Sequence, residues 1–167
     1  LVAPALIEVG IEPVAAHLYV LYFGMMSMIT PPIAMAAFAA ASIAQAPAMA
    51  TGWAAMKFGW SAYVIPVLFV FSPTLILIGA PFDIAVAILT SVAGVWLISA
   101  ALAGFFSGKL SPGMRLLFGL FGLMALIPAQ AFPGAYVTDL LGVLGGAGVM
   151  ALDVIKQKAA RSTQGAA

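Results

Sequence analysis

Charged side chains are so sparse in this sequence that they decide which solvent it can fold in. The chain has six Lys and Arg and five Asp and Glu among 167 residues, or 7%. Soluble domains carry about 25%, because charged groups cover the surface that meets water. Lipid removes that requirement, and helices satisfy their own backbone groups there. The sequence therefore predicts an all-α integral membrane protein, folded as a polytopic helical bundle.

Several classes of function are excluded by what the sequence lacks. A net charge of +1, with no basic patch among aromatic residues, argues against a nucleic-acid partner. The chain has no cysteine for thiolate metal sites, and its one histidine, His17, cannot hold a metal alone. Hydrolase and metalloprotease motifs are missing, and Gly142-Val-Leu-Gly145-Gly146 lacks the Lys and Ser/Thr of a phosphate loop. We therefore expect neither an enzyme nor a cofactor.

The longest uncharged segment contains two adjacent prolines. Residues 13–56 carry no charge, and this length is too great for one simple span, which needs about 20 residues. Proline lacks the backbone donor of a helix, and a second proline disfavours helix at the first. The sequence Thr30-Pro31-Pro32 therefore predicts a broken helix, with helical pieces at 17–29 and 33–46.

The rest of the chain divides at its charged residues. Residues 60–82 and 84–108 are uncharged and long enough for full spans joined at Asp83. Residues 116–131 and 140–152 are apolar but short, and form either two tilted spans or one re-entrant hairpin. The polar end is expected to be disordered. The sequence thus predicts four parts. Residues 1–59 contain the break at 30–32 and an interfacial amphipathic arm at 48–59, and residues 60–108 form two transmembrane helices. Residues 109–155 form two short helices or a hairpin, and residues 156–167 form a basic tail.

The basic residues fall on one side of this topology. Two short segments, 116–131 and 140–152, separate the basic tail from Lys109 and Arg115. Two crossings and one re-entrant hairpin both return the chain to the same side of the membrane, so Lys109 and Arg115 lie on the side of the tail. Two further spans place Lys57 on that side as well. Because an excess of Lys and Arg marks the cytoplasmic side, we expect the C-terminus and these three residues to face the cytoplasm.

The broken helix is the best candidate for a binding site. Non-helical backbone survives at membrane depth only where it is buried in protein or lines a cavity. Transporters use such breaks, because free helix-end carbonyls bind cations and half-helix N-termini face anions. Hydroxyl oxygens flank the break, so the candidate substrate or cation ligands are Ser27, Thr30, Pro31 and Pro32. A proline kink without a binding role is an equally frequent alternative.

Other polar and small residues give weaker indications. Glu8 and Glu12 are four apart and would share one face of a helix, where they could relay protons or ions. Marking the water interface is the commoner role for such a pair. His17 is expected to hydrogen-bond near that interface. The small residues at 34–46 and the glycines at 142–148 predict close helix packing.

Several segments resemble one transporter family. They are Leu1-Val-Ala-Pro-Ala-Leu-Ile-Glu8, Ala15-Ala-His17-Leu-Tyr-Val-Leu-Tyr-Phe-Gly24, Ile29-Thr-Pro-Pro32 and Thr51-Gly-Trp-Ala-Ala-Met-Lys57-Phe-Gly59. Together they resemble the C-terminal part of the large membrane (permease) subunit of tripartite ATP-independent periplasmic (TRAP) transporters, and most closely the type with fused small and large subunits. The resemblance is close over 1–82 and looser beyond. At Phe71-Ser72-Pro73 many relatives have an aromatic-Asn-Pro sequence, so any role of that Asn would be weakened here.

This resemblance implies an elevator-type, ion-coupled transporter in a bacterial inner membrane. Such a permease imports small organic acids delivered by a periplasmic binding protein, of the TAXI class for the fused type, and uses a Na⁺ or H⁺ gradient. The chain starts at Leu1 within an apolar pattern, so we expect it to continue a longer protein and not to transport alone. The alternative is a helical membrane scaffold or partner subunit, with a continuous kinked helix across 30–32.

Overall fold

The computed structural model describes residues 2–128 and 134–164, and every regular element within them is a helix. The chain divides into two compact units, residues 1–79 and 80–167. Two helices of the described part are long and apolar enough to cross a membrane, Pro81–Ala103 and Ala135–Lys158. A bent pair of shorter helices would make a third span. The prediction of an all-α integral membrane protein is confirmed.

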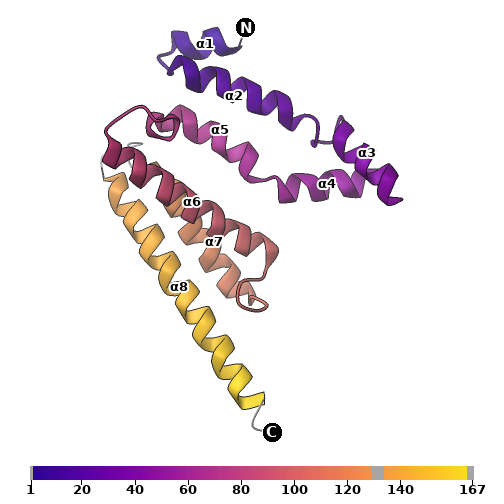
Figure 1. The fold of residues 1–167 in the computed structure, drawn as a ribbon, viewed down its shortest axis with the longest axis vertical. Coiled ribbons are helices and arrows are strands. Elements are labelled where there is room, and N and C mark those ends of the chain that lie inside the picture. Colours follow the sequence, from indigo (N-terminus) through magenta and orange to yellow (C-terminus); the bar gives the residue numbers. More distant parts are fainter. Residues whose placement is uncertain (1, 129–133, 165–167) are drawn as a thin grey trace. The chain divides into compact units, whose positions relative to one another are not determined.

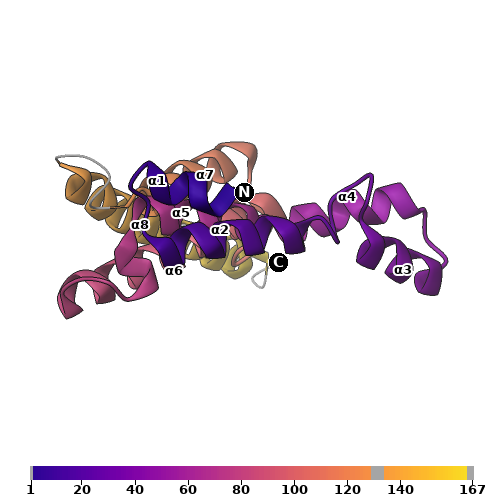
Figure 2. The same ribbon diagram turned by 90° about the horizontal axis from the view of Figure 1, so that it is seen from above.

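The first unit is a hairpin of two interrupted helices (Figure 1). Its elements are α1 (Val2–Glu8), α2 (Pro13–Met26), α3 (Met35–Ala44), α4 (Ala48–Phe58), α5 (Ser61–Phe71) and the 3₁₀-helix η1 (Pro73–Ile76). The chain reverses between α3 and α4, so that α3 packs against α4 and α2 packs against α5. Figure 2 shows the pairing of α3 with α4 from a second direction. Buried alanines at positions 37 and 41 lie on α3, as expected for a small-residue packing run.

The predicted helix over 60–82 is wrong in its second half. Helix α5 ends at Phe71, where Ser72 adopts φ −139° and ψ 87° and Pro73 starts η1. Proline has no backbone N–H to continue the helical hydrogen bonds. Leu77 and Gly79 have positive φ values of 65° and 145°, and the chain therefore turns before α6 begins at Pro81. Asp83, expected in the turn, lies in the first turn of α6, where the positive end of the helix dipole favours a carboxylate.

The second unit packs three helices around one core (Figure 1). They are α6 (Pro81–Ala103), α7 (Pro112–Leu126) and α8 (Ala135–Gln164). The core consists of Leu97, Ala100, Ala101, Leu110, Met114, Phe118 and Val149. Glycines stand where the helices approach most closely: Gly122 faces Ile98, Gly142 faces the backbone of Ala125, and Gly146 faces Leu97. The packing role expected for the glycines of 142–148 is therefore confirmed at Gly142 and Gly146.

Helix α8 is much longer than the sequence pattern indicated. The segment 140–152 was expected as a separate short helix, and the tail after it as disordered. The structure has one helix of 30 residues, and its backbone is helical to Gln164. Charged residues do not end the helix here, because Asp139 and Asp153 both lie inside α8 and are only 4% exposed. Whether α7 and α8 both cross the membrane stays a prediction.

One end of the second unit gathers its basic residues. The loop after α6 meets the C-terminal part of α8, where the hydroxyl of Ser107 donates to the Asp153 carboxylate at 2.5 Å. Arg115 Nε donates to the Ala101 carbonyl at 2.8 Å, which satisfies one of the carbonyls left free at the end of α6. Lys109 and Arg115 therefore lie at the same end of the unit as Lys156 on α8. This agrees with a one-sided charge distribution within the unit.

Candidate functional site

The helix break predicted at Thr30-Pro31-Pro32 is confirmed and extends over residues 27–34. These residues form successive turns between α2 and α3, and the Pro31–Pro32 peptide bond is cis. Ala34 closes the break in a left-handed conformation, with φ 34°, and is completely buried. Its backbone N–H donates to the carbonyls of Ser27 at 3.2 Å and Thr30 at 3.0 Å. The break is therefore a compact, hydrogen-bonded turn and not a continuous kinked helix, as the scaffold alternative required.

The two hydroxyl groups of the break point back to the end of α2. Ser27 Oγ donates to the carbonyl of Gly24 at 2.6 Å, and Thr30 Oγ1 donates to the carbonyl of Met26 at 2.6 Å. Each hydroxyl has one proton and two lone pairs. The protons are therefore committed to α2, while the oxygens keep their ability to accept a hydrogen bond or to bind a cation.

Backbone carbonyls add further oxygen atoms at the same place. In the described part of the chain, no backbone N–H donates to the carbonyls of Ile29, Pro31 or Pro32. The two prolines have no N–H of their own, so the local supply of donors is small. The break thus holds more hydrogen-bond acceptors than donors, and this balance favours a cation over an anion.

A second interruption lies opposite the first. Helices α4 and α5 meet at Gly59 and Trp60 with a bend of 40°. A Cβ atom on Gly59 would lie 3.0 Å from the Ile29 side chain, and one on Gly52 would lie 2.7 Å from the ring of Pro31. Ile29 and Pro31 of the break therefore rest on glycines of the other arm of the hairpin.

Tyr63 joins the two interruptions by a hydrogen bond. Its hydroxyl lies 2.7 Å from Thr30 Oγ1, and both side chains are half-buried. Sequence reasoning identified the break but missed Tyr63, Gly52 and Ala34. Tyr63 is 33 residues from Thr30, and only the neighbouring Gly59-Trp60 dipeptide hinted at a second interruption.

The acidic pair is not arranged as expected. Glu8 ends α1, Gly10 turns the chain with φ 94°, and Glu12 stands just before α2. Because the two residues are on different sides of a turn, they do not share the face of one helix. A role of Glu8 or Glu12 in a proton or ion relay stays a prediction, and no group of three His, Asp or Glu side chains suited to a metal occurs in the described residues.

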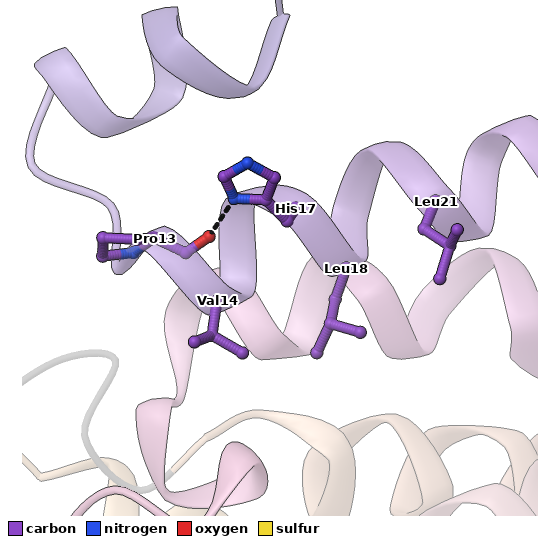
Figure 3. A pocket seen from close by; sticks show the side chains of 5 residues that line it. All are labelled: Pro13, Val14, His17, Leu18 and Leu21. Carbon is purple, nitrogen blue, oxygen red and sulfur yellow. Dashed lines mark hydrogen bonds between the residues drawn. The ribbon is translucent and has the colours of Figure 1, made fainter.

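His17 lies beside a shallow apolar depression on α2 (Figure 3). Its Nδ1 lies 2.7 Å from the Pro13 carbonyl, which is the local hydrogen bond expected from the sequence. The depression measures about 450 Å³, is open, and is lined by Pro13, Val14, His17, Leu18 and Leu21. His17 projects from a different side of the helix than Val14 and Leu18. With one polar side chain already bonded to its own helix, this depression offers little to a polar substrate.

Apolar helices of membrane-spanning length and a hairpin of interrupted helices define a multi-pass membrane protein, and interrupted helices are a feature that transporters also have. The chain belongs to the family of the tripartite ATP-independent periplasmic transporter DctM component, whose family model matches residues 1–84. No curated protein and no solved structure matches it. The chain is therefore a TRAP transporter permease sequence, from a family of transporters and not of enzymes, and its family works with further components such as a periplasmic binding protein.

The match covers the whole of the first unit and only the first residues of α6. The break and its opposing bend thus lie in the part that carries the family relationship. The second unit lies almost wholly outside it, and the fused small-plus-large architecture stays a prediction.

Proposed function

We propose that this chain forms part of the permease of a secondary transporter that imports small organic acids and is driven by a cation gradient. The observation that carries the proposal is the pair of facing interruptions, because broken helices supply the substrate and ion sites of such transporters. The acids are delivered by a periplasmic binding protein, of the TAXI class. The permease works in a bacterial inner membrane as an elevator, with the break in its moving domain.

The coupling cation binds at the break. Hard cations take oxygen ligands, and the carbonyls of Ile29, Pro31 and Pro32 are not occupied by backbone donors in the described part of the chain. Thr30 and Ser27 contribute hydroxyl oxygens beside them. The negative end of the α2 dipole also lies there and favours positive charge. Na⁺ fits these ligands better than H⁺, since none of them is a base.

Removing the Thr30 hydroxyl tests the site directly. In the complete permease with its binding protein in proteoliposomes, we expect Thr30→Val to raise the cation concentration for half-maximal uptake by about tenfold. One oxygen ligand is lost, and a contact to a charged group is worth about 1.5–3 kcal/mol. Ser27→Ala is expected to act in the same direction. The measurement is the cation dependence of initial uptake.

The matched control is Thr51→Val, because Thr51 makes the same kind of local bond, Oγ1 to the Pro47 carbonyl at 3.0 Å, at the start of α4 and not to a residue of the break. Its cation dependence should equal that of the unaltered permease. Unchanged cation dependence and rate in both Thr30→Val and Ser27→Ala would remove these side chains from the site.

The orientation of the second unit is tested with single cysteines. The chain has no native cysteine. Lys109→Cys, on the exposed part of the basic loop, should resist an impermeant thiol reagent in intact cells and react after permeabilisation. Phe82→Cys, exposed at the opposite end of α6, should react in intact cells. The reverse labelling pattern contradicts a cytoplasmic C-terminus. Position 109 is chosen over the neighbouring Leu110, because Leu110 is buried and a cysteine there would react poorly.

A further inference from the structure

The hydrogen bond between Tyr63 and Thr30 has only one consistent direction. Thr30 has a single hydroxyl proton, and Thr30 Oγ1 donates it to the Met26 carbonyl at 2.6 Å. The contact of 2.7 Å between Tyr63 Oη and Thr30 Oγ1 therefore requires the tyrosine to donate. The result is a chain of two bonds, from Tyr63 through Thr30 to the end of α2.

This chain fixes the free lone pair of Thr30. One lone pair accepts from Tyr63 and the proton points at Met26, so a single lone pair remains, with a set direction. Bonds in such a chain polarise one another. A ligand oxygen held by two bonds loses little freedom when a cation arrives, and preorganisation of this kind strengthens binding.

The donor belongs to the other arm of the hairpin. Tyr63 stands in the first turn of α5, just after the bend, while Thr30 lies in the break after α2. Further contacts hold α5 on α2, among them the edge-to-face rings of Tyr22 and Phe69, with centroids 5.9 Å apart. The Tyr63–Thr30 bond therefore forms only while α5 is docked beside the break.

We propose that Tyr63 is a positioning residue: its hydroxyl orients Thr30, and so links the cation affinity of the break to the docking of α5 against α2. The proposal rests on the proposed function, because it assumes that the cation binds at Thr30. By reciprocity, a bound cation stabilises the docked arrangement of the two arms. The position of α5 after its bend from α4 therefore influences the cation affinity of the break, although the bend supplies no ligand.

Tyr63→Phe removes the hydroxyl and keeps the ring. In the complete permease with its binding protein in proteoliposomes, the cation concentration for half-maximal uptake should rise about threefold to tenfold, the loss expected for one hydrogen bond. The maximal rate at saturating cation should change much less. Tyr22→Phe is the matched control, since no residue in the described part of the chain hydrogen-bonds its hydroxyl and its ring contact is kept. Its cation dependence should stay unchanged.

A double-mutant cycle separates this role from a general loss of structure. Because Tyr63 acts through Thr30, Tyr63→Phe should add nothing to the half-maximal cation concentration of Thr30→Val. An equal rise in both backgrounds overturns the proposal. Amide hydrogen exchange at residues 28–36 gives a readout independent of transport, and it should speed up in Tyr63→Phe but not in Tyr22→Phe.

The outcomes distinguish a failure of the cation site from a failure of the role of Tyr63 in it. If Thr30→Val raises the half-maximal cation concentration and Tyr63→Phe does not, the proposed function stands and the role of Tyr63 is refuted. If Thr30→Val leaves cation dependence unchanged, the Thr30 hydroxyl is not a cation ligand, and the role of Tyr63 in orienting it is refuted together with that ligand.

Discussion

Gly142→Ala is expected to strongly destabilise the three-helix unit. A Cβ atom at this position would meet the backbone of α7, at 2.8 Å from Ala125 Cα and 2.9 Å from the carbonyl carbon of Met124. A flexible side chain could rotate away from such a clash, but a helix backbone moves only with its whole helix. Overpacking of this kind costs about 1–3 kcal/mol, and the upper end applies where backbone must shift. The measurement is the thermal unfolding of the purified protein in detergent.

Gly148→Ala is the matched control on the same helix. In the described part of the chain, no atom other than those of its chain neighbours and its own helix backbone lies within 4 Å of the Cβ position at Gly148. Alanine is the better helix former by about 1 kcal/mol, so this variant should unfold at the same temperature or slightly higher. A similar loss of stability in both variants contradicts the close approach of α7 and α8 at Gly142.

Gly52→Ala is expected to abolish most transport by displacing the helix break. A Cβ atom on Gly52 would lie 2.7 Å from Cγ of Pro31. The proline ring cannot swing away as an open side chain can, so the break itself must move off α4. A cost of about 1–3 kcal/mol corresponds to roughly a fivefold to hundredfold loss. Initial uptake in proteoliposomes measures it.

Gly24→Ala serves as the comparison for this second glycine. Gly24 lies on α2 close to the break, and among the described residues only its chain neighbours and its own helix backbone come within 4 Å of its Cβ position. Uptake by this variant should remain within about twofold, since alanine is favourable in a helix. Full activity of Gly52→Ala would mean that the break does not rest on α4 in the working transporter.

The parts of the fold that sequence reasoning predicted correctly are those governed by local chemistry. Two adjacent prolines cannot continue a helix, and a break at 30–32 follows from that rule alone, although in the structure it extends over 27–34. The scarcity of charge led to the membrane class in the same way. The same rule applies at Pro73, which starts the 3₁₀-helix η1 and ends the helix predicted over 60–82.

The parts that were missed depend on contacts between distant residues. Asp153 is buried inside α8 because Ser107, 46 residues earlier, donates to it. Without that partner a buried carboxylate is costly, and the sequence pattern therefore indicated a helix end. Tyr63 escaped notice for a similar reason. A tyrosine in an apolar helix looks like ordinary packing until a partner on another segment is known.

The three helices of the second unit differ in length, so the packing of the unit depends on the thickness of its membrane. Helix α6 has 23 residues and α7 has 15, which correspond to about 35 Å and about 23 Å. A hydrocarbon core measures about 30 Å. For α7 to cross the membrane, as one of the two sequence predictions has it, the lipids beside it must thin to match its length, at a cost of a fraction of a kcal/mol per Å. Shorter acyl chains reduce that cost, so the lipid surroundings help to determine how firmly α7 stays between its longer neighbours.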